Sequence, residues 1–334
     1  MTRIAINWFG RIGKLALKSI IERGISDIEV VAVNDLWWAK TAAHLFEFDS
    51  TYWKFNWTVE HDDENIIVNG KKIRVCSERN PEDLPWKEFN IDVVLECTGV
   101  FRNKEWAMKH ITAWAKKVII SAPAKGEVDW TYVVWVNDED IKNTDIIVSN
   151  ASCTTNCLAP VVKVLNDNFK IIWGLMNTIH SYTGDQRVLD AAHSDLRRWR
   201  TATESIIPTS TGAAKAVWLV IPELKWKLDW FSMRVPTPTV SCVDFTFETK
   251  EEIDIEKINN SLKQSSENEL KWILWFETRP LVSIDYRKDD RSSIIDADLT
   301  KVIWKHMWKI VAWYDNEWGY SCRLVDLAKL IGNL

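Results

Sequence analysis

The chain has 334 residues, of which 46% are hydrophobic and 27% are charged, and its formal net charge is −5. This composition is typical of globular proteins, and the length is enough for about two domains. The net negative charge argues against nucleic acid as the main partner. No apolar run approaches the roughly 18 residues that span a bilayer. The N-terminal pattern predicts a strand rather than a signal peptide.

The first 150 residues alternate between strand and helix patterns. Apolar strand patterns occupy 4–7, 27–35, 91–99 and 116–124, with helical patterns at 11–23 and 103–113 and a more polar hairpin near 57–75. Alternation of this kind is typical of βαβ units with right-handed crossovers. We therefore expect a doubly wound parallel α/β sheet over 1–150, the Rossmann arrangement.

The pattern changes after residue 150. A helix is predicted from about 151, and long strand-like runs follow at 174–183, 231–240, 241–250, 282–287 and 309–315. Runs of strands with few helices favour a mixed or antiparallel sheet, and hence an α+β domain over 151–315. The polar segment 183–210 has no clear period, and loops of that length are usually functional. A helix over 316–334 ends the chain.

The stretch NWFGRIG, residues 7–13, follows the first strand. Gly10 and Gly13 hold two places of the dinucleotide-binding pattern G-x-G-x-x-G, but Trp8 holds the first place. Asp35 ends the second strand and could accept a hydrogen bond from an adenosine ribose, which favours NAD over NADP. The alternative is an ordinary βαβ crossover with chance glycines.

Cys153 lies at the predicted start of the helix in ASCTTNC. The N-terminus of a helix stabilises a thiolate, which can attack an aldehyde or ester carbon. The alternative is a small buried core cysteine, which Cys157, one turn later, more readily fits. The whole chain has only six cysteines, so we do not expect a disulfide framework. We expect instead a reducing, cytoplasmic location.

A base and an anion site can be sought among the polar residues of the second half. His180 ends a strand pattern and could accept a proton from a thiol, or it could be a satisfied strand-end histidine. Arg234 lies in an otherwise apolar strand, where arginine needs an anionic partner or a structural ion pair. Thr183 is close to His180 in sequence, and STGAAK (210–215) offers hydroxyl and N–H groups before a helix.

Taken together, these stretches closely resemble the NAD-dependent, phosphorylating glyceraldehyde-3-phosphate dehydrogenases. The resemblance runs nearly end to end, and its most specific pieces are ASCTTNCLAP and WYDNEWGYS. It implies a Rossmann domain that the C-terminal helix rejoins, a catalytic domain and a homotetramer. It also implies oxidation of glyceraldehyde 3-phosphate to 1,3-bisphosphoglycerate through a thiohemiacetal and a thioester, a reaction of glycolysis and gluconeogenesis.

The resemblance also implies roles for individual residues. Cys153 would be the nucleophile and His180 the general base. Thr183 and Arg234 would hold the phosphate of the substrate, while the attacking phosphate would lie near Ser152, Thr154, Thr211 and Gly212. Contacts with NAD would come from Gly10, Arg11, Ile12, Gly13, Asp35, Ser121 and Asn316. No metal is expected.

The chain departs from the family in its tryptophans. It has 21 Trp and only 11 Gly, whereas average usage would give roughly 23 Gly. The family has glycine where this chain has Trp at positions 8, 114, 135, 218, 226, 230, 272, 275, 304 and 308, and by expectation at 53 and 57. Glycine often serves positions of positive φ or close backbone contact, where any side chain costs free energy.

Two alternatives to this function remain open at the level of sequence. One is an inactive or engineered scaffold of the same fold, whose NAD site Trp8 blocks. The other is an erythrose-4-phosphate dehydrogenase, because that close relative shares the cysteine, the histidine and the anion-site residues.

Overall fold

We describe a computed structural model of the chain. It describes the backbone of residues 1–334 and all side chains except those of Ala213 and Ala214. The chain forms two compact units. The first contains Met1–Val134, Asp140–Ala151 and Ser321–Leu334, and the second contains Trp135–Glu139 and Ser152–Tyr320.

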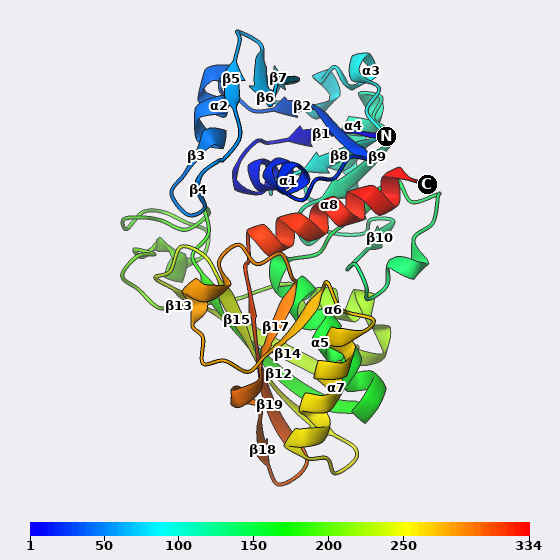
Figure 1. Cartoon of the computed structure of the whole chain (residues 1–334), viewed down its shortest axis with the longest axis vertical. Helices are drawn as coiled ribbons and strands as arrows, with labels where there is room; N and C mark the ends of the chain where they lie inside the picture. Colours follow the sequence, from blue (N-terminus) through cyan, green and yellow to red (C-terminus); the bar gives the residue numbers. More distant parts are fainter. The chain divides into compact units, whose positions relative to one another are not determined.

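The first unit is built around a nine-stranded sheet in the order β10-β11-β9-β8-β1-β2-β7-β6-β5 (Figure 1). Its strands are β1 (Thr2–Asn7), β2 (Ile28–Asn34), β5 (Val59–His61), β6 (Asn65–Val68), β7 (Lys71–Cys76), β8 (Val93–Glu96), β9 (Lys117–Ile120), β10 (Trp130–Thr131) and β11 (Ile147–Ser149), while β3 (Phe48–Asp49) and β4 (Trp53–Lys54) form a separate pair. All pairs from β10 to β7 are parallel, and β7-β6 and β6-β5 are antiparallel. The predicted parallel Rossmann sheet and the hairpin near 57–75 are both present.

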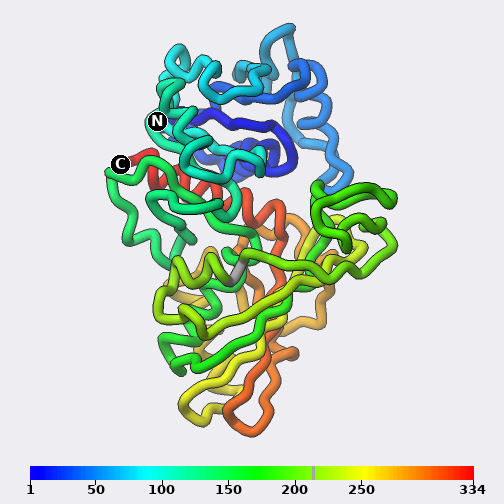
Figure 2. Tube along the Cα trace, turned by 180° about the vertical axis from the view of Figure 1, so that it is seen from behind, coloured from blue at the N-terminus to red at the C-terminus, as the bar shows by residue number. Residues whose placement is uncertain are grey.

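The helices of the first unit pack on this sheet. They are α1 (Arg11–Glu22), α2 (Ala39–Glu47), α3 (Trp86–Phe89), α4 (Lys104–Thr112) and most of α8 (Trp318–Gly332). In Figure 2 the end of the chain, in red, returns to the unit that contains the N-terminus. Leu324, Leu327 and Ile331 of α8 join Ile4 and Ile6 of β1 in one buried core. Burial of this apolar stripe is what attaches the last helix.

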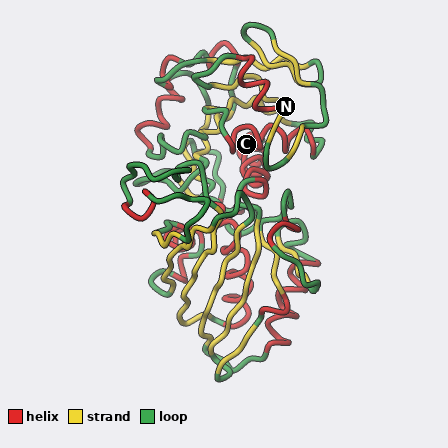
Figure 3. The backbone as a smooth tube through the Cα atoms, turned by 90° about the vertical axis from the view of Figure 1, so that its left-hand side faces the viewer, coloured by secondary structure: helices red, strands yellow, loops and turns green.

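The second unit contains an eight-stranded sheet with the order β13-β14-β12-β15-β19-β17-β16, and β18 pairs with β19. Figure 3 shows its long strands in yellow. They are β12 (Ile171–Ser181), β13 (Ile207–Thr209), β14 (Leu228–Val235), β15 (Ser241–Thr249), β16 (Leu274–Glu277), β17 (Ser293–Asp296), β18 (Lys301–Ile303) and β19 (Met307–Tyr314). The pairs β12-β14 and β16-β17 are parallel and the others antiparallel, so the expected mixed sheet is present.

The helices of the second unit are α5 (Cys153–Phe169), α6 (Ala213–Val220) and α7 (Ile255–Glu267). The strand predicted at 282–287 is wrong, because Ser283–Tyr286 forms a 3₁₀ turn, η5. The carboxylate of Asp285 accepts a hydrogen bond from the N–H of Val282 at 2.9 Å, a local bond that closes the turn.

Six tryptophans have a backbone conformation that normally belongs to glycine. We call them the left-handed tryptophans: Trp8, Trp53, Trp114, Trp135, Trp226 and Trp304, with φ between 59° and 77°. All six belong to the positions at which the sequence resemblance calls for glycine. A bulky side chain at positive φ is a genuine conformational outlier, so the fold retains a backbone suited to glycine at each of these positions.

Candidate active site

Cys153 is the first residue of α5. Ser152 caps this helix, since its hydroxyl accepts a hydrogen bond from the N–H of Thr155 at 3.0 Å. Burial raises the pKa of the Cys153 thiol, while the Arg234 guanidinium and the N–H of Thr154 act in the opposite direction. The helix start therefore offsets part of the cost of forming a thiolate in a dry environment.

His180, near the end of β12, faces that thiol. Its Nε2 lies 3.4 Å from Sγ of Cys153, and its Nδ1 lies 2.6 Å from the carbonyl oxygen of Ser181. Nη1 of Arg234 also lies 3.1 Å from Nδ1, but the contact with the carbonyl is the shorter one. Because a carbonyl can only accept, this contact favours the tautomer in which Nδ1 carries the proton and Nε2 presents a lone pair to the sulfur. Burial, and then the charge of Arg234, lower the pKa of His180 to about 3. The ring is thus neutral and able to accept a proton.

Arg234 and Thr183 lie beside this histidine. The parallel register of β12 and β14 sets Arg234 opposite His180. Nη1 of Arg234 donates to the carbonyl of Ser181 at 3.1 Å and to Oγ1 of Thr183 at 3.0 Å. Burial lowers the pKa of Arg234. A half-buried guanidinium next to a hydroxyl is well suited to hold a phosphate.

Tyr314, at the end of β19, is a site residue that the sequence reasoning missed. Its hydroxyl bonds to Oγ1 of Thr154 at 2.8 Å and to Oγ1 of Thr178 at 2.9 Å, and its ring meets that of His180 edge to face. Tyr314 therefore ties the first turn of α5 to β12, the two elements that carry the thiol and the imidazole. The tyrosine lies in WYDNEWGYS, a stretch that carries the family resemblance but for which the sequence predicted no role of Tyr314 in the site.

Asp185 and Arg198 were also missed. Asp185 accepts a hydrogen bond from the hydroxyl of Thr183, and its other oxygen lies 2.5 Å from Nη1 of Arg198. Arg198 also donates to Oγ1 of Thr209 at 3.0 Å. These bonds hold the polar segment 183–210 close to Thr183. The adjacent arginines in DLRR were the available sequence signal.

The remaining expected anion-site residues occupy two places. Thr154 is buried, and its hydroxyl is bound to Tyr314, while hydrogen bonds from both its N–H and its side chain lower the pKa of the Cys153 thiol. Thr211 and Gly212 come directly before α6, with Gly212 as the cap of that helix, and a Cβ added to Gly212 would meet open space. This is the arrangement of a loop that opens a helix toward an anion.

The glycine turn of the first unit forms between β1 and α1. A Cβ at Gly13 would lie 2.5 Å from the carbonyl oxygen of Trp8, so only glycine lets the helix pack this closely on the strand. A Cβ at Gly10 would lie 2.6 Å from Nε1 of Trp8. The indole thus covers the backbone at Gly10, where the second glycine of the pattern allows a pyrophosphate to approach.

Asp35 and a neighbouring pocket fit the adenosine half of a dinucleotide. Asp35 follows β2 and is almost fully buried, its Oδ1 has no hydrogen-bond partner in the structure, and burial raises its pKa. A pocket of about 270 Å³ lies at the carboxyl ends of β1, β2 and β8. It is lined by Asn7, Trp8, Asn34, Leu36, Glu78, Arg79, Thr98, Val100 and Phe101. Such a switch point is where ligands bind in open α/β sheets.

The other expected cofactor contacts lie in both units. In the first, Arg11 begins α1 with its side chain paired to Asp49 at 2.8 Å, Ile12 packs against the core, and Ser121 follows β9. In the second, Oδ1 of Asn316 accepts from the hydroxyl of Ser241 at 2.9 Å. The acceptor of that amide is used, which leaves its NH₂ group to donate to a ligand.

Two family models match the chain. The model described as "Glyceraldehyde 3-phosphate dehydrogenase, NAD binding domain" matches residues 2–104. The model described as "Glyceraldehyde 3-phosphate dehydrogenase, C-terminal domain" matches residues 152–316, which include the thiol, the imidazole and Arg234.

Curated relatives match over nearly the full length. "Glyceraldehyde-3-phosphate dehydrogenase 2" of Trichormus variabilis is 56% identical over 99% of this chain and 98% of its own. "Glyceraldehyde-3-phosphate dehydrogenase" of Geobacillus stearothermophilus is 54% identical over 99% and 98%, and that of Zymomonas mobilis is 53% identical over 98% and 97%. Across the described residues, no helix is long and apolar enough to cross a membrane.

Proposed function

The chain belongs to the glyceraldehyde-3-phosphate dehydrogenase family, and from this we propose that it oxidises glyceraldehyde 3-phosphate to 1,3-bisphosphoglycerate with NAD and inorganic phosphate. The observation that carries the proposal is the 3.4 Å contact between Sγ of Cys153 and Nε2 of His180. The names of the relatives favour this reaction over oxidation of erythrose 4-phosphate and over an inactive scaffold.

The reaction begins at the thiol. Sγ of Cys153 attacks the aldehyde carbon, and the thiol proton passes by way of Nε2 of His180 to the carbonyl oxygen, which gives a thiohemiacetal on the cysteine. Nε2 then accepts the proton of the thiohemiacetal hydroxyl as the carbon is oxidised to a thioester. An oxygen of inorganic phosphate attacks the thioester carbon, and the sulfur leaves as thiolate.

Oriented donors stabilise the charge that develops on oxygen in these steps. The N–H of Cys153, at the start of α5, and His180 once it is protonated would serve the thiohemiacetal oxygen. Arg234 and Thr183 would hold the phosphate of the substrate, which lets the aldehyde carbon rest near the sulfur. Ser152, Thr211 and Gly212 would serve the attacking phosphate, together with the N–H of Thr154.

NAD fits the first unit by its unpartnered carboxylate oxygen at Asp35 and the pocket beside it. When bound, NAD supplies the acceptor for the hydride. Asp35 would accept from the adenosine ribose, the first turn of α1 would face the pyrophosphate, and the amide of Asn316 would hold the nicotinamide end. A 2′-phosphate beside Asp35 would be repelled.

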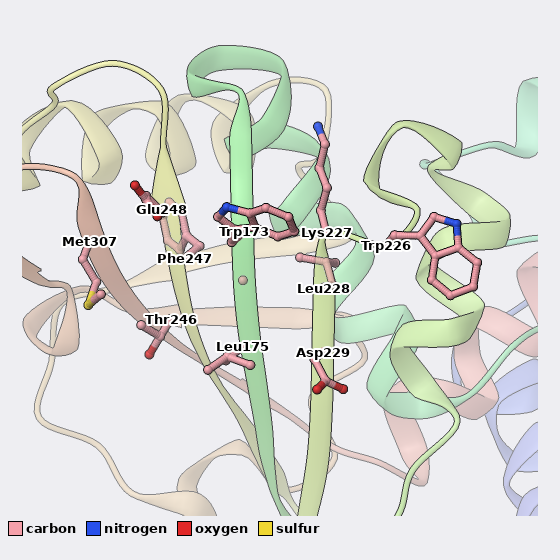
Figure 4. A pocket seen from close by; sticks show the side chains of 11 residues that line it. Trp173, Leu175, Trp226, Lys227, Leu228, Asp229, Thr246, Phe247, Glu248 and Met307 are labelled. Carbon is pink, nitrogen blue, oxygen red and sulfur yellow. The ribbon is translucent and has the colours of Figure 1, made fainter.

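An exposed apolar face of the eight-stranded sheet in the second unit supports assembly with further copies of the chain. We propose that the assembly is a homotetramer. Figure 4 shows Trp173 and Leu175 on β12 among neighbours from β14 and β15, around a pocket of about 350 Å³. Leu175 is 64% exposed and Phe231 is 48% exposed. Exposed apolar patches mark protein interfaces. We expect light scattering to give a lower mass for Leu175→Lys and an unchanged mass for Leu45→Lys, a control at an exposed leucine of α2. An unchanged mass in both variants rejects this face.

A cytoplasmic location is also our proposal. It rests on the cysteines, all six of which are free thiols, including the buried Cys157 and Cys322. Fractionation of the source cells should recover the activity with cytoplasmic markers, and recovery with another compartment would reject it.

The function is tested by following NADH absorbance with each substrate omitted in turn. We expect a rate that requires glyceraldehyde 3-phosphate, NAD and phosphate together. A rate that persists without phosphate would mean hydrolysis of the thioester instead. A larger kcat/KM for erythrose 4-phosphate would favour that sugar phosphate as the substrate. If no NADH forms although Cys153 is still alkylated rapidly, the inactive scaffold with a blocked NAD site would be favoured.

A further inference from the structure

A buried polar network lies behind the dinucleotide pocket of the first unit. Its centre is Glu96, the last residue of β8, whose side chain is 1% exposed. One carboxylate oxygen accepts from Nδ2 of Asn7 at 2.6 Å and faces Nε2 of His110 at 3.1 Å. The other accepts from the N–H of Thr98 at 2.8 Å and from its hydroxyl. Four donors thus converge on one buried carboxylate.

The tautomer of His110 is fixed from its other side. Nε1 of Trp86 donates to Nδ1 of His110 at 3.0 Å, and indole nitrogen can only donate. Nδ1 is therefore the acceptor, and Nε2 carries the proton that points at Glu96. The ring cannot change tautomer without leaving the Trp86 donor buried and unpaired.

The network ends on the pocket wall on both sides. Oγ1 of Thr98 accepts from the N–H groups of Val100 and Phe101 at 3.1 and 3.2 Å, which shapes the turn that lines one wall. On the other side, Oδ1 of Asn7 accepts from Asn34 at 2.8 Å, and Asn34 is bound to the backbone of Glu78. The pocket walls are thus joined to one another through Glu96.

We propose that Glu96 and His110 are positioning residues for cofactor binding, a role that rests on the proposed function. Neither residue lines the pocket. They act by holding Asn7 and the Thr98–Phe101 turn in the conformation that binds the adenosine half of the cofactor. Loss of this support lowers the affinity for the cofactor and leaves the thiol chemistry at Cys153 intact.

The test is binding of ADP-ribose, which has the adenosine half without the hydride-accepting ring, measured by calorimetry on the full chain. Glu96→Gln places an amide NH₂ where both Asn7 and His110 donate, and we expect the Kd to rise about tenfold. Asp62→Asn, at an exposed carboxylate bound to Lys72, is the matched control and should leave the Kd unchanged. Alkylation of Cys153 should proceed at the same rate in all three proteins.

A second variant separates positioning from a loss of folding. Trp86→Phe removes the donor that fixes His110, so the imidazole can turn Nε2 into an acceptor for the new amide. The double variant Glu96→Gln with Trp86→Phe should therefore bind ADP-ribose more tightly than Glu96→Gln alone. If Glu96→Gln does not fold, Thr98→Val removes the hydroxyl that joins Glu96 to the turn, keeps the N–H bond, and should raise the Kd. An unchanged Kd for ADP-ribose in the folded variants overturns the proposal. This result is independent of the NADH assay that tests the proposed function, so failure of one can be told from failure of the other.

The tryptophans occupy two different kinds of environment. Trp86 and Trp313 sit in surroundings suited to indole, with Nε1 bound to His110 at 3.0 Å and to Asp296 at 3.1 Å. The left-handed tryptophans differ, since each has positive φ, and Trp304 is 89% exposed. Among the residues that the structure describes fully, 13 non-glycine residues have positive φ, and six of these are Trp and two are Asn. Asn is the residue that tolerates this conformation best after glycine.

We infer that the natural polypeptide carries glycine at the six left-handed tryptophans. The chain has only 11 Gly and as many as 21 Trp. Replacement of glycine by tryptophan explains both the deficit of glycine and the excess of tryptophan. Glycine at position 8 would also remove the indole from the backbone of Gly10 and complete the pattern at 8, 10 and 13.

Mass spectrometry of the protein isolated from its own cells tests this inference. Glycine in place of tryptophan lowers the mass by about 129 Da at each position, relative to the 38.8 kDa of the chain with tryptophan at all six positions. Peptides that contain positions 8, 114 and 304 should carry glycine, whereas peptides that contain Trp86 and Trp313 should keep tryptophan. Tryptophan at the six positions overturns the inference.

Discussion

Sγ of Cys153 and Nε2 of His180 lie 3.4 Å apart, and they are held by two different elements, the start of α5 and the end of β12. Neither element alone contains both groups. Tyr314 joins the two elements, and the carbonyl of Ser181 holds Nδ1 of the histidine at 2.6 Å.

Cys153→Ser should reduce turnover by at least about a thousandfold, since a serine hydroxyl is a far weaker nucleophile than a thiolate without further activation. NAD binding should be retained, because the Asp35 pocket lies in the other unit. Cys157→Ser, one helical turn away and buried, is the control and should keep most of the activity. Retained turnover in Cys153→Ser would refute the nucleophile assignment.

Arg234→Gln should move the alkylation of Cys153 to higher pH. The guanidinium favours the thiolate and so lowers the pKa of Cys153, and its loss raises that pKa. Because the thiolate is the reactive form, iodoacetamide should react more slowly at any pH below the new pKa, and a pKa higher by about 1 makes the reaction about tenfold slower. The pH profile of the alkylation rate gives the measurement, and Arg200→Gln, in an exposed pair with Asp190, should leave the profile in place.

Tyr314→Phe should destabilise the second unit by about 1–3 kcal/mol, because the hydroxyls of Thr154 and Thr178 lose a buried partner. The activity at saturating substrate should fall as well, since the link between α5 and β12 is lost. Urea unfolding and kcat measure the two effects. Tyr320→Phe, on α8, serves as the comparison, and equal effects from both variants would contradict a specific role for Tyr314.

Asp35→Asn should weaken NAD binding about tenfold, because a charged acceptor for the ribose hydroxyls becomes neutral. The same change removes the repulsion toward a 2′-phosphate, so the ratio of the Kd values for NADP and NAD should fall. Titration with both cofactors measures this ratio. A ratio that does not change would remove Asp35 from cofactor selection.

Trp8→Gly, made in the chain that keeps its other tryptophans, should tighten NAD binding, because the indole no longer covers the turn at Gly10. Trp114→Gly relieves a similar backbone conformation, with φ of 76° against 77°, at an exposed helix end. It is therefore the control for strain alone. Calorimetry with NAD and with adenosine separates the cases, since adenosine has no pyrophosphate and should bind both variants equally. Equal NAD affinities in the two variants would mean that the indole does not obstruct binding.

The sequence could predict the elements whose pattern is local. The alternation of strands and helices over 1–150, the helix that begins at Cys153 and the last helix were all expected from periodicity and small-residue signals. The 3₁₀ turn at Ser283–Tyr286 was expected as a strand, because the side-chain bond of Asp285 that closes it does not alter the apolar pattern.

The candidate site could be predicted only in part for a similar reason. Cys153, His180 and Arg234 each carry a chemical signal in their own segment. The contribution of Tyr314 depends on β19 lying two strands away from β12, and that of Glu96 on a histidine from the following helix. Contacts between distant segments follow from strand order and packing, which periodicity does not encode.

The hydroxyl of Ser241 accepts from the N–H of Ser181 at 3.0 Å and donates to Asn316 at 2.9 Å. One small side chain is therefore the common joint between the residue after the base and the residue expected at the nicotinamide end. A rotation of the Asn316 amide therefore shifts the hydroxyl of Ser241 and, through it, the backbone of Ser181, which orients the His180 imidazole. Binding of NAD at Asn316 can in this way change the orientation of the His180 imidazole, which acts on the substrate bound to Cys153.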